Sequence, residues 1–262
     1  MDENNHTFAV CAYGESPYLE ECIQSLLAQT VSTGIVVATS TSNEHIATLA
    51  AKYDLPLYVR DGQSGIAADW NYAIEAANTP FVTVAHQDDI YSETYAEEML
   101  DAVAMHPDLL VFFTNYGELR NGKVVDDNKL LTIKRRMLAP LENGKHASSI
   151  FVRRRILSLG SAICCPSVTI NTAATGTPVF REGLKSNLDW EAWERLSKLS
   201  GVFYYDSKIL MHHRIHEQSE TTHLIEGNIR GGEDLVMFKK FWPSPIAKAI
   251  NVVYSSSEKS NE

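Results

Sequence analysis

Short apolar runs alternate with amphipathic helical patterns through the first half of the chain, and this alternation restricts the fold more than any other feature. Helical spacing is clearest after the first run, where the apolar residues are Leu19, Cys22, Ile23, Leu26 and Leu27. The runs that favour β-strands lie at residues 8–13, 34–39, 57–59, 81–85 and 109–113. The alternation predicts βαβ units, and we expect an α/β fold with a Rossmann-like, mostly parallel sheet flanked by helices.

Residues 117–147 interrupt this alternation, because they are polar, contain Lys and Arg, and show little periodicity. The pattern predicts a surface excursion or mobile segment within a small α+β portion. The tail after Tyr254 is rich in Ser, Lys and Glu, which predicts disorder. Further patterns predict helices at 150–160, 188–199 and 233–242, a Thr-rich strand after Pro166 and a last strand at 202–205.

The charge balance argues against nucleic acid as a partner. Asp and Glu number 33 against 23 Lys and Arg, the formal charge is −10, and the basic residues look scattered along the chain. No segment has the ~18 apolar residues of a membrane helix, and the acidic, polar N-terminus does not resemble a signal peptide. We therefore expect a cytoplasmic protein. The four cysteines show neither C-x-x-C pairs nor zinc spacing, which favours buried structural thiols.

Two adjacent carboxylates, Asp88 and Asp89, follow directly after the strand predicted at 81–85. Ligands of open α/β sheets bind beyond the carboxyl ends of such strands. Neighbouring carboxylates repel each other unless a cation or hydrogen bonds compensate, and a small set of oxygen ligands suits Mg²⁺ or Mn²⁺. We predict a metal site at this pair; the alternative is that one of the two caps the following helix.

Two further clusters contain residues suited to catalysis or anion binding. Asp189 and Glu191 open the helix predicted at 188–199, where the helix dipole alone would also favour them. Arg214 and His216 follow an apolar run, and an extended conformation would project both to one side, a spacing suited to a pyrophosphate. A solvated basic loop, or a zinc site formed by the histidines of this stretch, is the alternative.

The order of these motifs along the chain resembles that of family 2 glycosyltransferases, which implies a GT-A-type fold. Residues 12–30 resemble the family's first nucleotide-binding turn and helix. Residues 64–73 resemble its helix start with glycine and asparagine, which lies beside the diphosphate. His86-Gln87-Asp88-Asp89 stands where the family has its D-x-D-type metal motif.

The second half of the chain continues the resemblance. Asp189-Trp190-Glu191 is similar to the motif that supplies the catalytic base, which implies Asp189 in that role with Glu191 as the second choice. Residues 214–219 are similar to the R-x-H-x-x-S stretch that closes over the leaving nucleotide. The resemblance further implies Asp88 and Asp89 as metal ligands for Mn²⁺ or Mg²⁺. The residues implied to contact the donor are Ala12, Tyr13, Glu15, Thr39, Ser40, Gly65, Asp69, Asn71, Asp88, Arg214, His216 and Ser219.

Two departures from the family pattern bear on the site. The family often carries an acidic loop after its second strand that binds the base, whereas Thr39-Ser40-Thr41-Ser42 stands here. This loop therefore does not identify the base, and uracil is the base that we expect. His86 replaces the first Asp of the fuller D-x-D-D pattern, so metal binding is expected to rest on Asp88 and Asp89. By the family pattern one of these binds the ion and the other the ribose.

The resemblance implies metal-dependent, inverting transfer of a hexosyl or N-acetylhexosaminyl group from a nucleoside diphosphate sugar to an acceptor hydroxyl, in cell-surface polysaccharide synthesis. The acceptor would be a glycan or a lipid-linked molecule, and the donor sugar and oligomeric state stay open. We expect residues 1–115 to form the nucleotide-sugar-binding half, 116–222 the acceptor-binding and catalytic half, and 223–262 a C-terminal helix with a disordered tail.

Three alternatives accompany this interpretation. A nucleotidyltransferase would need a basic, Gly-rich loop after the first strand, and residues 12–16 contain neither Arg nor Lys. A non-catalytic sugar-nucleotide-binding protein is compatible with the altered loop at 39–42. Residues 238–242 mix Phe, Trp and Lys as peripheral membrane segments do, whereas a terminal helix packed on the core is the preferred interpretation of the same pattern.

Overall fold

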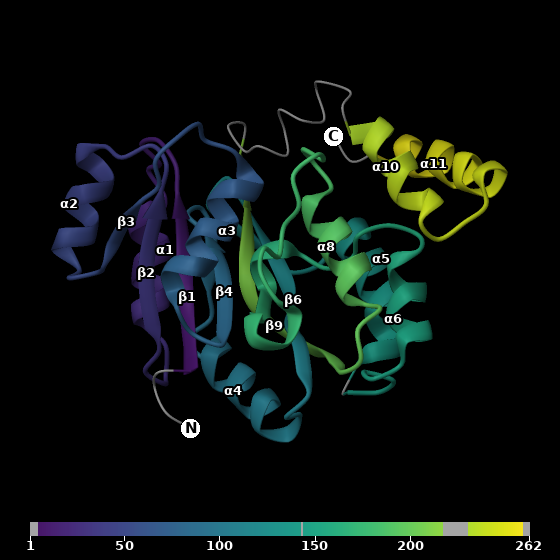
Figure 1. The fold of residues 1–262 in the computed structure, drawn as a ribbon, viewed down its shortest axis with the longest axis horizontal. Helices are drawn as coiled ribbons and strands as arrows, with labels where there is room; N and C mark the ends of the chain where they lie inside the picture. The colour runs from purple at the N-terminus through teal and green to yellow at the C-terminus, as the bar shows by residue number, and fades with distance from the viewer. Residues whose placement is uncertain (1–4, 143, 217–229, 259–262) are drawn as a thin grey trace.

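One mixed sheet forms the centre of the molecule, and the computed structural model describes residues 5–142, 144–216 and 230–258 (Figure 1). Its strands in the described residues are β1 (His6–Ala12), β2 (Gly34–Thr39), β3 (Leu57–Val59), β4 (Phe81–His86), β5 (Ile90–Tyr91), β6 (Leu109–Arg120), β7 (Lys123–Val125), β8 (Val168–Asn171) and β9 (Val202–Ile215). Their order is β3-β2-β1-β4-β8-β6-β9-β5, with β7 paired to β6. The mostly parallel α/β architecture expected from the sequence is confirmed.

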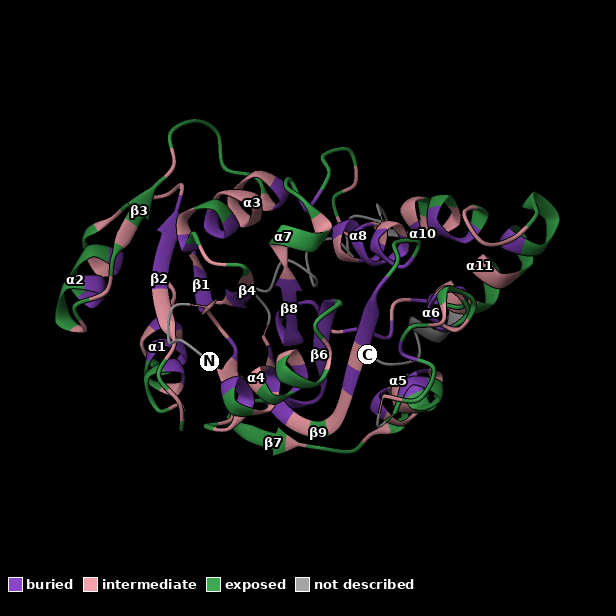
Figure 2. Ribbon diagram, turned by 60° about the horizontal axis from the view of Figure 1, so that its bottom comes forward, coloured by how far each residue is buried: buried purple, intermediate pink, exposed green. Residues whose placement is uncertain are grey.

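Helices cover both faces of this sheet. Those in the described residues are α1 (Leu19–Leu27), α2 (Glu44–Lys52), α3 (Ile66–Ala77), α4 (Tyr95–Met105), α5 (Lys129–Leu138), α6 (Ile150–Leu157), α7 (Thr172–Thr175), α8 (Leu188–Leu196), α10 (Arg230–Lys239) and α11 (Ser244–Glu258), with short 3₁₀ turns η2 (Ala139–Leu141) and η3 (Cys165–Ser167). Helices α1 and α4 pack on one face, and α3 and α8 on the other (Figure 2). Among these helices we find none that is both long and apolar enough to cross a bilayer.

Strand β1 shows why the parallel strands are apolar throughout. Phe8 and Val10 belong to the core beneath α1 and α4, while Ala9 belongs to the core beneath α3 and α8. All three side chains are fully buried. A strand covered by helices on both faces needs apolar residues at consecutive positions, which accounts for the continuous runs in the sequence.

Strands β6 and β9 form a long parallel pair that corrects two predictions. The strand expected at 202–205 continues to Ile215, because β9 stays paired with β6 as far as Arg120. The segment 117–147, expected to be a mobile excursion, is instead the end of β6, the β6–β7 hairpin, α5 and η2. Its weak periodicity reflects several short elements in succession. Only the last residues of β9 reach the candidate site.

The C-terminal helices settle the alternatives for residues 238–242. Phe238 is fully buried against Trp190, and the Trp242 indole N–H donates to the carbonyl of Ser158 at 2.7 Å. Phe238 and Trp242 thus pack on the rest of the protein, as the preferred interpretation of the sequence pattern predicted. Helix α11 continues past Tyr254, where the sequence predicted disorder, and ends at Glu258. Residues 259–262 lie outside the described part of the chain.

A buried histidine in β1 predicts that the protein loses stability at mildly acidic pH. His6 bonds to the Thr83 hydroxyl at 2.8 Å, and burial lowers its pKa to about 3. Below the unfolded pKa of ~6.5 the unfolded chain binds a proton that the native state excludes, so stability falls as pH falls from 6.5 toward 3. This histidine alone is expected to lower the free energy of unfolding by about 2 kcal/mol between pH 7 and pH 5.

Urea unfolding at the two pH values measures this loss. His6→Asn should remove about 2 kcal/mol of it, and His146→Asn, at an exposed position, serves as the matched control and should leave it unchanged. An unchanged pH dependence in His6→Asn would show that the pKa of His6 is not lowered in the native state.

Candidate functional site

The carboxyl end of β4 and the end of β9 come together at Asp89. Pairing of Ile90 with His212 places β9 directly beside the chain that leaves β4. Asp89 is fully buried, and its Oδ1 accepts from the backbone N–H of Arg214 and from the ring of His213, both at 2.9 Å. Burial alone would lower the pKa of His213, but the charge of Asp89 and the hydrogen bond to it outweigh burial and raise it. The carboxylate of Asp89 is thus held rigidly at the strand end.

Arg214 forms a second connection across the same place. Its Nε donates to the carbonyl of Asp88 at 2.7 Å, and its guanidinium pairs with Glu21 and lies 4.3 Å from the centre of the Tyr18 ring. His216 bonds to Oδ2 of Asp88 at 3.0 Å. The structure therefore brings Asp88, Arg214 and His216, which lie far apart in the sequence, into one cluster.

The donor set at this cluster fits a divalent cation. One ligand atom from each of His86, Asp88 and Asp89 lies within 4.8 Å of the others. Nε2 of His86 and Oδ2 of Asp89 are buried without a hydrogen-bond partner in the described part of the chain. Burial lowers the pKa of His86 to about 4, so its imidazole is neutral, the form that binds metals. Metal binding was expected from the two Asp residues alone; the geometry adds His86, whose ring stacks on Trp70 at 4.9 Å.

The loops after β1 and β2 interlock beside this cluster. Gln87 bonds to both the N–H and the C=O of Tyr13, and the N–H of Gly14 donates to the Thr41 hydroxyl at 2.8 Å. Gly14 has a φ of +58°, a conformation that glycine adopts readily, and a side chain there would meet no atom within 4 Å. The side chains of Tyr13 and Glu15 are exposed. The turn after β1 therefore presents open space next to the carboxylates.

Ala12 and Thr39, both predicted to contact the donor, are buried at the carboxyl ends of β1 and β2, where they are paired with each other in the sheet. The Thr39 hydroxyl accepts from the N–H of Thr41 at 3.0 Å. These two residues lie beneath the interlocked loops. Ser219, the last residue of the predicted R-x-H-x-x-S stretch, lies outside the described residues.

Asp69, on α3, joins two neighbouring loops, the one after β2 and the one between β3 and α3. Its carboxylate accepts from Arg60 at 2.8 Å and from the Ser40 hydroxyl and the Gly65 N–H at 3.0 Å. It therefore orders the turn at Gly65 that opens α3. The amide of Asn71, which was predicted to contact the donor, donates to the carbonyl of Phe180 and accepts from two backbone N–H groups of the same segment. Asn71 holds the segment before α8 in place.

Asp189 lies in the first turn of α8, where its Oδ1 accepts from the N–H of Trp190 at 2.7 Å. Burial raises the pKa of the Cys164 and Cys165 thiols, and the charges of Asp89 and Asp189 raise both further. The two thiols are thus within electrostatic reach of both carboxylates. None of the four cysteines forms a disulfide, as expected.

Glu191 is committed to ion pairs. Its carboxylate lies 2.9 Å from the Lys240 ammonium and 3.7 Å from Nε of Arg195. These contacts join α8 to the end of α10.

Two acidic residues of α10 were not singled out from the sequence. Glu233 accepts from the backbone N–H groups of Lys185, Ser186 and Asn187 at 2.7–3.1 Å. Asp234, fully buried, accepts from the amide of Asn187 at 2.8 Å. Together they hold the turn that leads into Asp189. The only sequence signal was an acidic pair at a helix start, which does not identify a partner more than 40 residues away.

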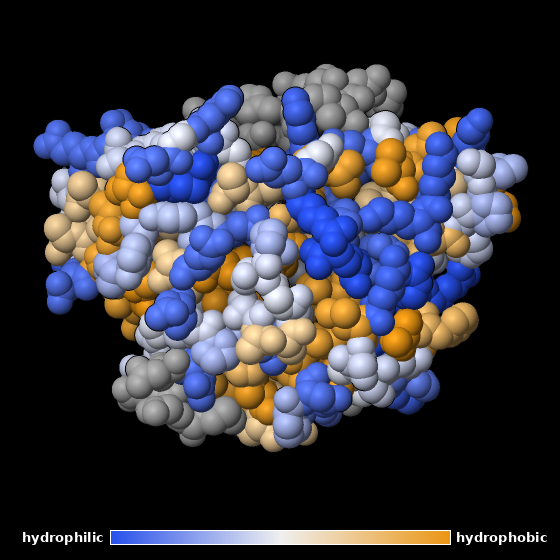
Figure 3. Space-filling model, viewed as in Figure 1, coloured by the Kyte–Doolittle hydropathy of each residue, from blue (hydrophilic) through white to orange (hydrophobic). Residues whose placement is uncertain are grey.

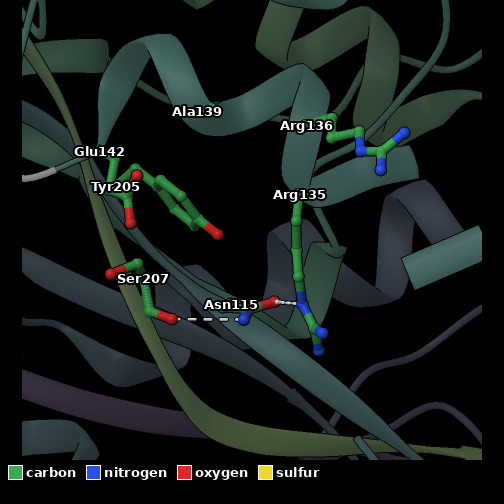
Figure 4. A pocket seen from close by; sticks show the side chains of 7 residues that line it. All are labelled: Asn115, Arg135, Arg136, Ala139, Glu142, Tyr205 and Ser207. Carbon is green, nitrogen blue, oxygen red and sulfur yellow. Dashed lines mark hydrogen bonds between the residues drawn. The ribbon is translucent and has the colours of Figure 1, made fainter. Parts of the chain in front are cut away.

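A cavity of about 340 Å³ lies elsewhere, between β6, β9 and α5 (Figure 4). Asn115 bonds there to Arg135 and to the carbonyl of Ser207, and Arg136 points away from the other lining side chains (Figure 4). In the sheet, Arg214 of the carboxylate cluster pairs with Leu119 of β6. Asn115, in the wall of the cavity, lies four residues before Leu119, which is about 13 Å along the strand. The cavity is therefore separate from the carboxylate cluster.

Comparison with solved structures identifies the fold as GT-A-like. TarS residues 1–349 from S. aureus superimpose with a TM-score of 0.61 at 17% identity, over 94% of this chain and 69% of that one. The same protein in complex with UDP-GlcNAc gives a TM-score of 0.60 at 18% identity, over 94% and 70%. Mannosyltransferase PcManGT from Pyrobaculum calidifontis, in complex with GDP-Man and Mn²⁺, gives 0.61 at 14% identity, over 96% and 69%. No curated protein sequence matches this chain significantly.

The fold and the cluster at the end of β4 together define a GT-A-like α/β protein. The sequence model of glycosyl transferase family 2 matches residues 7–159, more than half of the chain. The chain belongs to glycosyl transferase family 2. The match includes His86, Asp88 and Asp89 and ends before α8 and β9.

Proposed function

We propose that this chain transfers a sugar from a nucleoside diphosphate sugar to an acceptor hydroxyl, by inverting single displacement. One observation carries the proposal: His86, Asp88 and Asp89 converge at a strand end, and buried polar atoms of His86 and Asp89 lack hydrogen-bond partners in the described residues. A divalent cation bound by these residues would offset the charge of the donor's diphosphate. Membership of family 2 supports the same conclusion.

The other residues of the site divide into two roles. Arg214 supplies positive charge beside the acidic cluster, and Glu21 and Tyr18 hold its guanidinium there. We assign removal of the acceptor proton to Asp189, because a positioned carboxylate can act as general base and the resemblance to the family's acidic motif implies this residue. The loops at 13–15 and 39–41, joined by Gln87 and Thr41, are the proposed binding surface for the nucleoside.

We propose a uridine nucleotide as donor and Mn²⁺ or Mg²⁺ as the cation. TarS has been solved with UDP-GlcNAc and PcManGT with GDP-Man and Mn²⁺, so both bases occur among proteins of this fold. A glycan or a lipid-linked molecule is the proposed acceptor, bound by the half of the chain that contains α8. A non-catalytic sugar-nucleotide-binding protein is the second candidate, because hydroxyl groups at Thr39, Ser40 and Thr41 replace the family's acidic loop.

Thermal unfolding with a panel of UDP-sugars and GDP-mannose, each with Mn²⁺ or Mg²⁺, tests the donor class. A ligand at 100 times its Kd stabilises the native state by ~2.7 kcal/mol, so we expect the UDP-sugars to raise Tm by about 5–10 °C. GDP-mannose with the same metal is the matched control for the base. If GDP-mannose alone raised Tm, the proposed donor would be a guanosine nucleotide and not a uridine nucleotide.

No shift with any member of the panel would contradict nucleotide-sugar binding altogether. Release of free sugar and UDP during long incubation separates the two candidates, since a non-catalytic binding protein would show the thermal shift without slow hydrolysis.

A further inference from the structure

Basic residues are concentrated in one part of the chain, although they look scattered when the sequence is read as a whole. Eight of the 23 Lys and Arg residues, but one of the 33 Asp and Glu residues, lie between 129 and 160. This stretch has a formal charge of +7, whereas the remaining 230 residues, with 15 basic and 32 acidic side chains, carry −17. It comprises α5, η2 and α6, which lie side by side at one end of the molecule (Figures 1 and 2).

Some of these basic residues form hydrogen bonds or ion pairs within the protein. Arg153 is buried and donates to the carbonyls of Gly201 and Leu199, and Arg154 pairs with Glu194. Lys134 and Arg135 bond to β6 and its neighbourhood. The remaining cations, Lys129, Arg136, Lys145 and Arg155, are exposed, and none of them has an ion pair within the described residues.

Exposed apolar side chains lie among these cations at helical spacing. On α6, Phe151 and Arg155 are four residues apart, and Leu159 follows just after the helix ends; Phe151 is 78% and Leu159 44% exposed. On α5, Lys129, Ile133 and Arg136 share one face, and Ile133 is 45% exposed. In Figure 3, strongly hydrophilic and hydrophobic side chains adjoin over the region of α6. Each helix therefore presents both cations and apolar groups to solvent.

We propose that this surface, formed by Lys129, Ile133, Arg136, Phe151, Arg155 and Leu159, docks on an anionic lipid bilayer. Cations next to a negatively charged leaflet are attracted to it, while the net negative charge of the rest of the chain turns that part away. Apolar side chains between the cations insert at the boundary of headgroups and acyl chains. A hydrated polyanion would match the charge but would leave Phe151 exposed. The docking site is thus on α5 and α6 and not at residues 238–242.

Vesicle flotation tests the proposal without reference to sugar transfer. The wild-type chain should float with vesicles of 70% phosphatidylcholine and 30% phosphatidylglycerol, and remain in solution with phosphatidylcholine alone. Raising the salt concentration from about 0.05 to 0.5 M should release most of it, because salt screens surface attraction. Equal binding to both vesicle types, or no binding to the anionic vesicles, would overturn the proposal.

Substitutions locate the surface. The double variant Arg136→Glu, Arg155→Glu should lower the partition coefficient on anionic vesicles at least about 100-fold, since each unit of charge contributes about fivefold and four units change. Phe151→Ser should lower it about 10-fold with little change in salt dependence. Lys52→Glu and Tyr58→Ser, exposed positions on α2 and β3 at the other end of the molecule, are the matched controls.

Two further results would reject the bilayer as partner. One is that the α5–α6 variants partition like their controls. The other is that the wild-type chain is retained on heparin while failing to float with the anionic vesicles, which would place a soluble polyanion on this surface instead. Circular dichroism and thermal unfolding of each variant establish that the fold is retained.

Discussion

Asp189→Asn is expected to reduce turnover about 10²–10⁴-fold while leaving donor binding nearly unchanged. The amide keeps the oxygen that accepts from the N–H of Trp190, so the first turn of α8 should retain its conformation. What is lost is the capacity to take the acceptor proton. Steady-state kinetics together with calorimetric titration of UDP and Mn²⁺ separate the two quantities.

The comparison with Glu191→Gln decides between the two carboxylates of α8. Glu191 is paired with Lys240 and Arg195, so its substitution should affect mainly the free energy of unfolding. Asp101→Asn, at an exposed position of α4, controls for the change of one surface charge. Full activity in Asp189→Asn would reject Asp189 as the base, and a selective loss in Glu191→Gln would transfer the role to that residue.

Asp89→Asn is expected to weaken Mn²⁺ binding, and with it metal-dependent donor binding, by more than about 100-fold. Replacement of a residue that merely supports a metal ligand already costs about 10–100-fold in affinity, and here a ligand itself loses its charge. The Asn oxygen can still accept from the Arg214 N–H, which limits the structural damage. Calorimetric titration of Mn²⁺ in the presence and absence of UDP measures the effect.

Asp126→Asn is the matched control for this experiment. Asp126 also pairs with a histidine, His212, at 2.8 Å, but it is exposed and outside the acidic cluster. It should bind Mn²⁺ and UDP as the wild type does. If Asp89→Asn bound Mn²⁺ with wild-type affinity, Asp89 would not be a metal ligand. If both variants lost affinity, the cause would be a general electrostatic effect.

Local patterns in the sequence predicted much of the architecture. Consecutive apolar residues such as Phe8, Ala9 and Val10 indicate a strand that is buried on both faces. Apolar residues at helical spacing indicate a helix with one buried face. Both patterns depend on neighbouring residues only. They were sufficient to place two carboxylates at the end of β4, since a strand and the residues after it are contiguous in the chain.

Local patterns failed where several short elements follow one another. Residues 117–147 contain a strand end, a hairpin and α5, each too short to establish its own period. The extension of β9 to Ile215 was missed for a related reason: its end carries polar residues, among them His212, which bonds to Asp126, and His213, which bonds to Asp89 of the site.

The chemistry of the candidate site is assembled from residues that only folding brings together. Asp89 meets Arg214 across 125 positions, Arg214 meets Glu21 across 193, and Asn71 meets Phe180 across 109. Periodicity carries no information about such pairs, because each side chain satisfies its local pattern whether or not its distant partner exists. The amino-acid order was thus enough to specify strands, helices and the place of the acidic pair. Packing in three dimensions decided the rest. It adds His86 to that pair and engages Glu191 and Asn71 in structural contacts. It also places Glu233 and Asp234 where they hold the turn before Asp189.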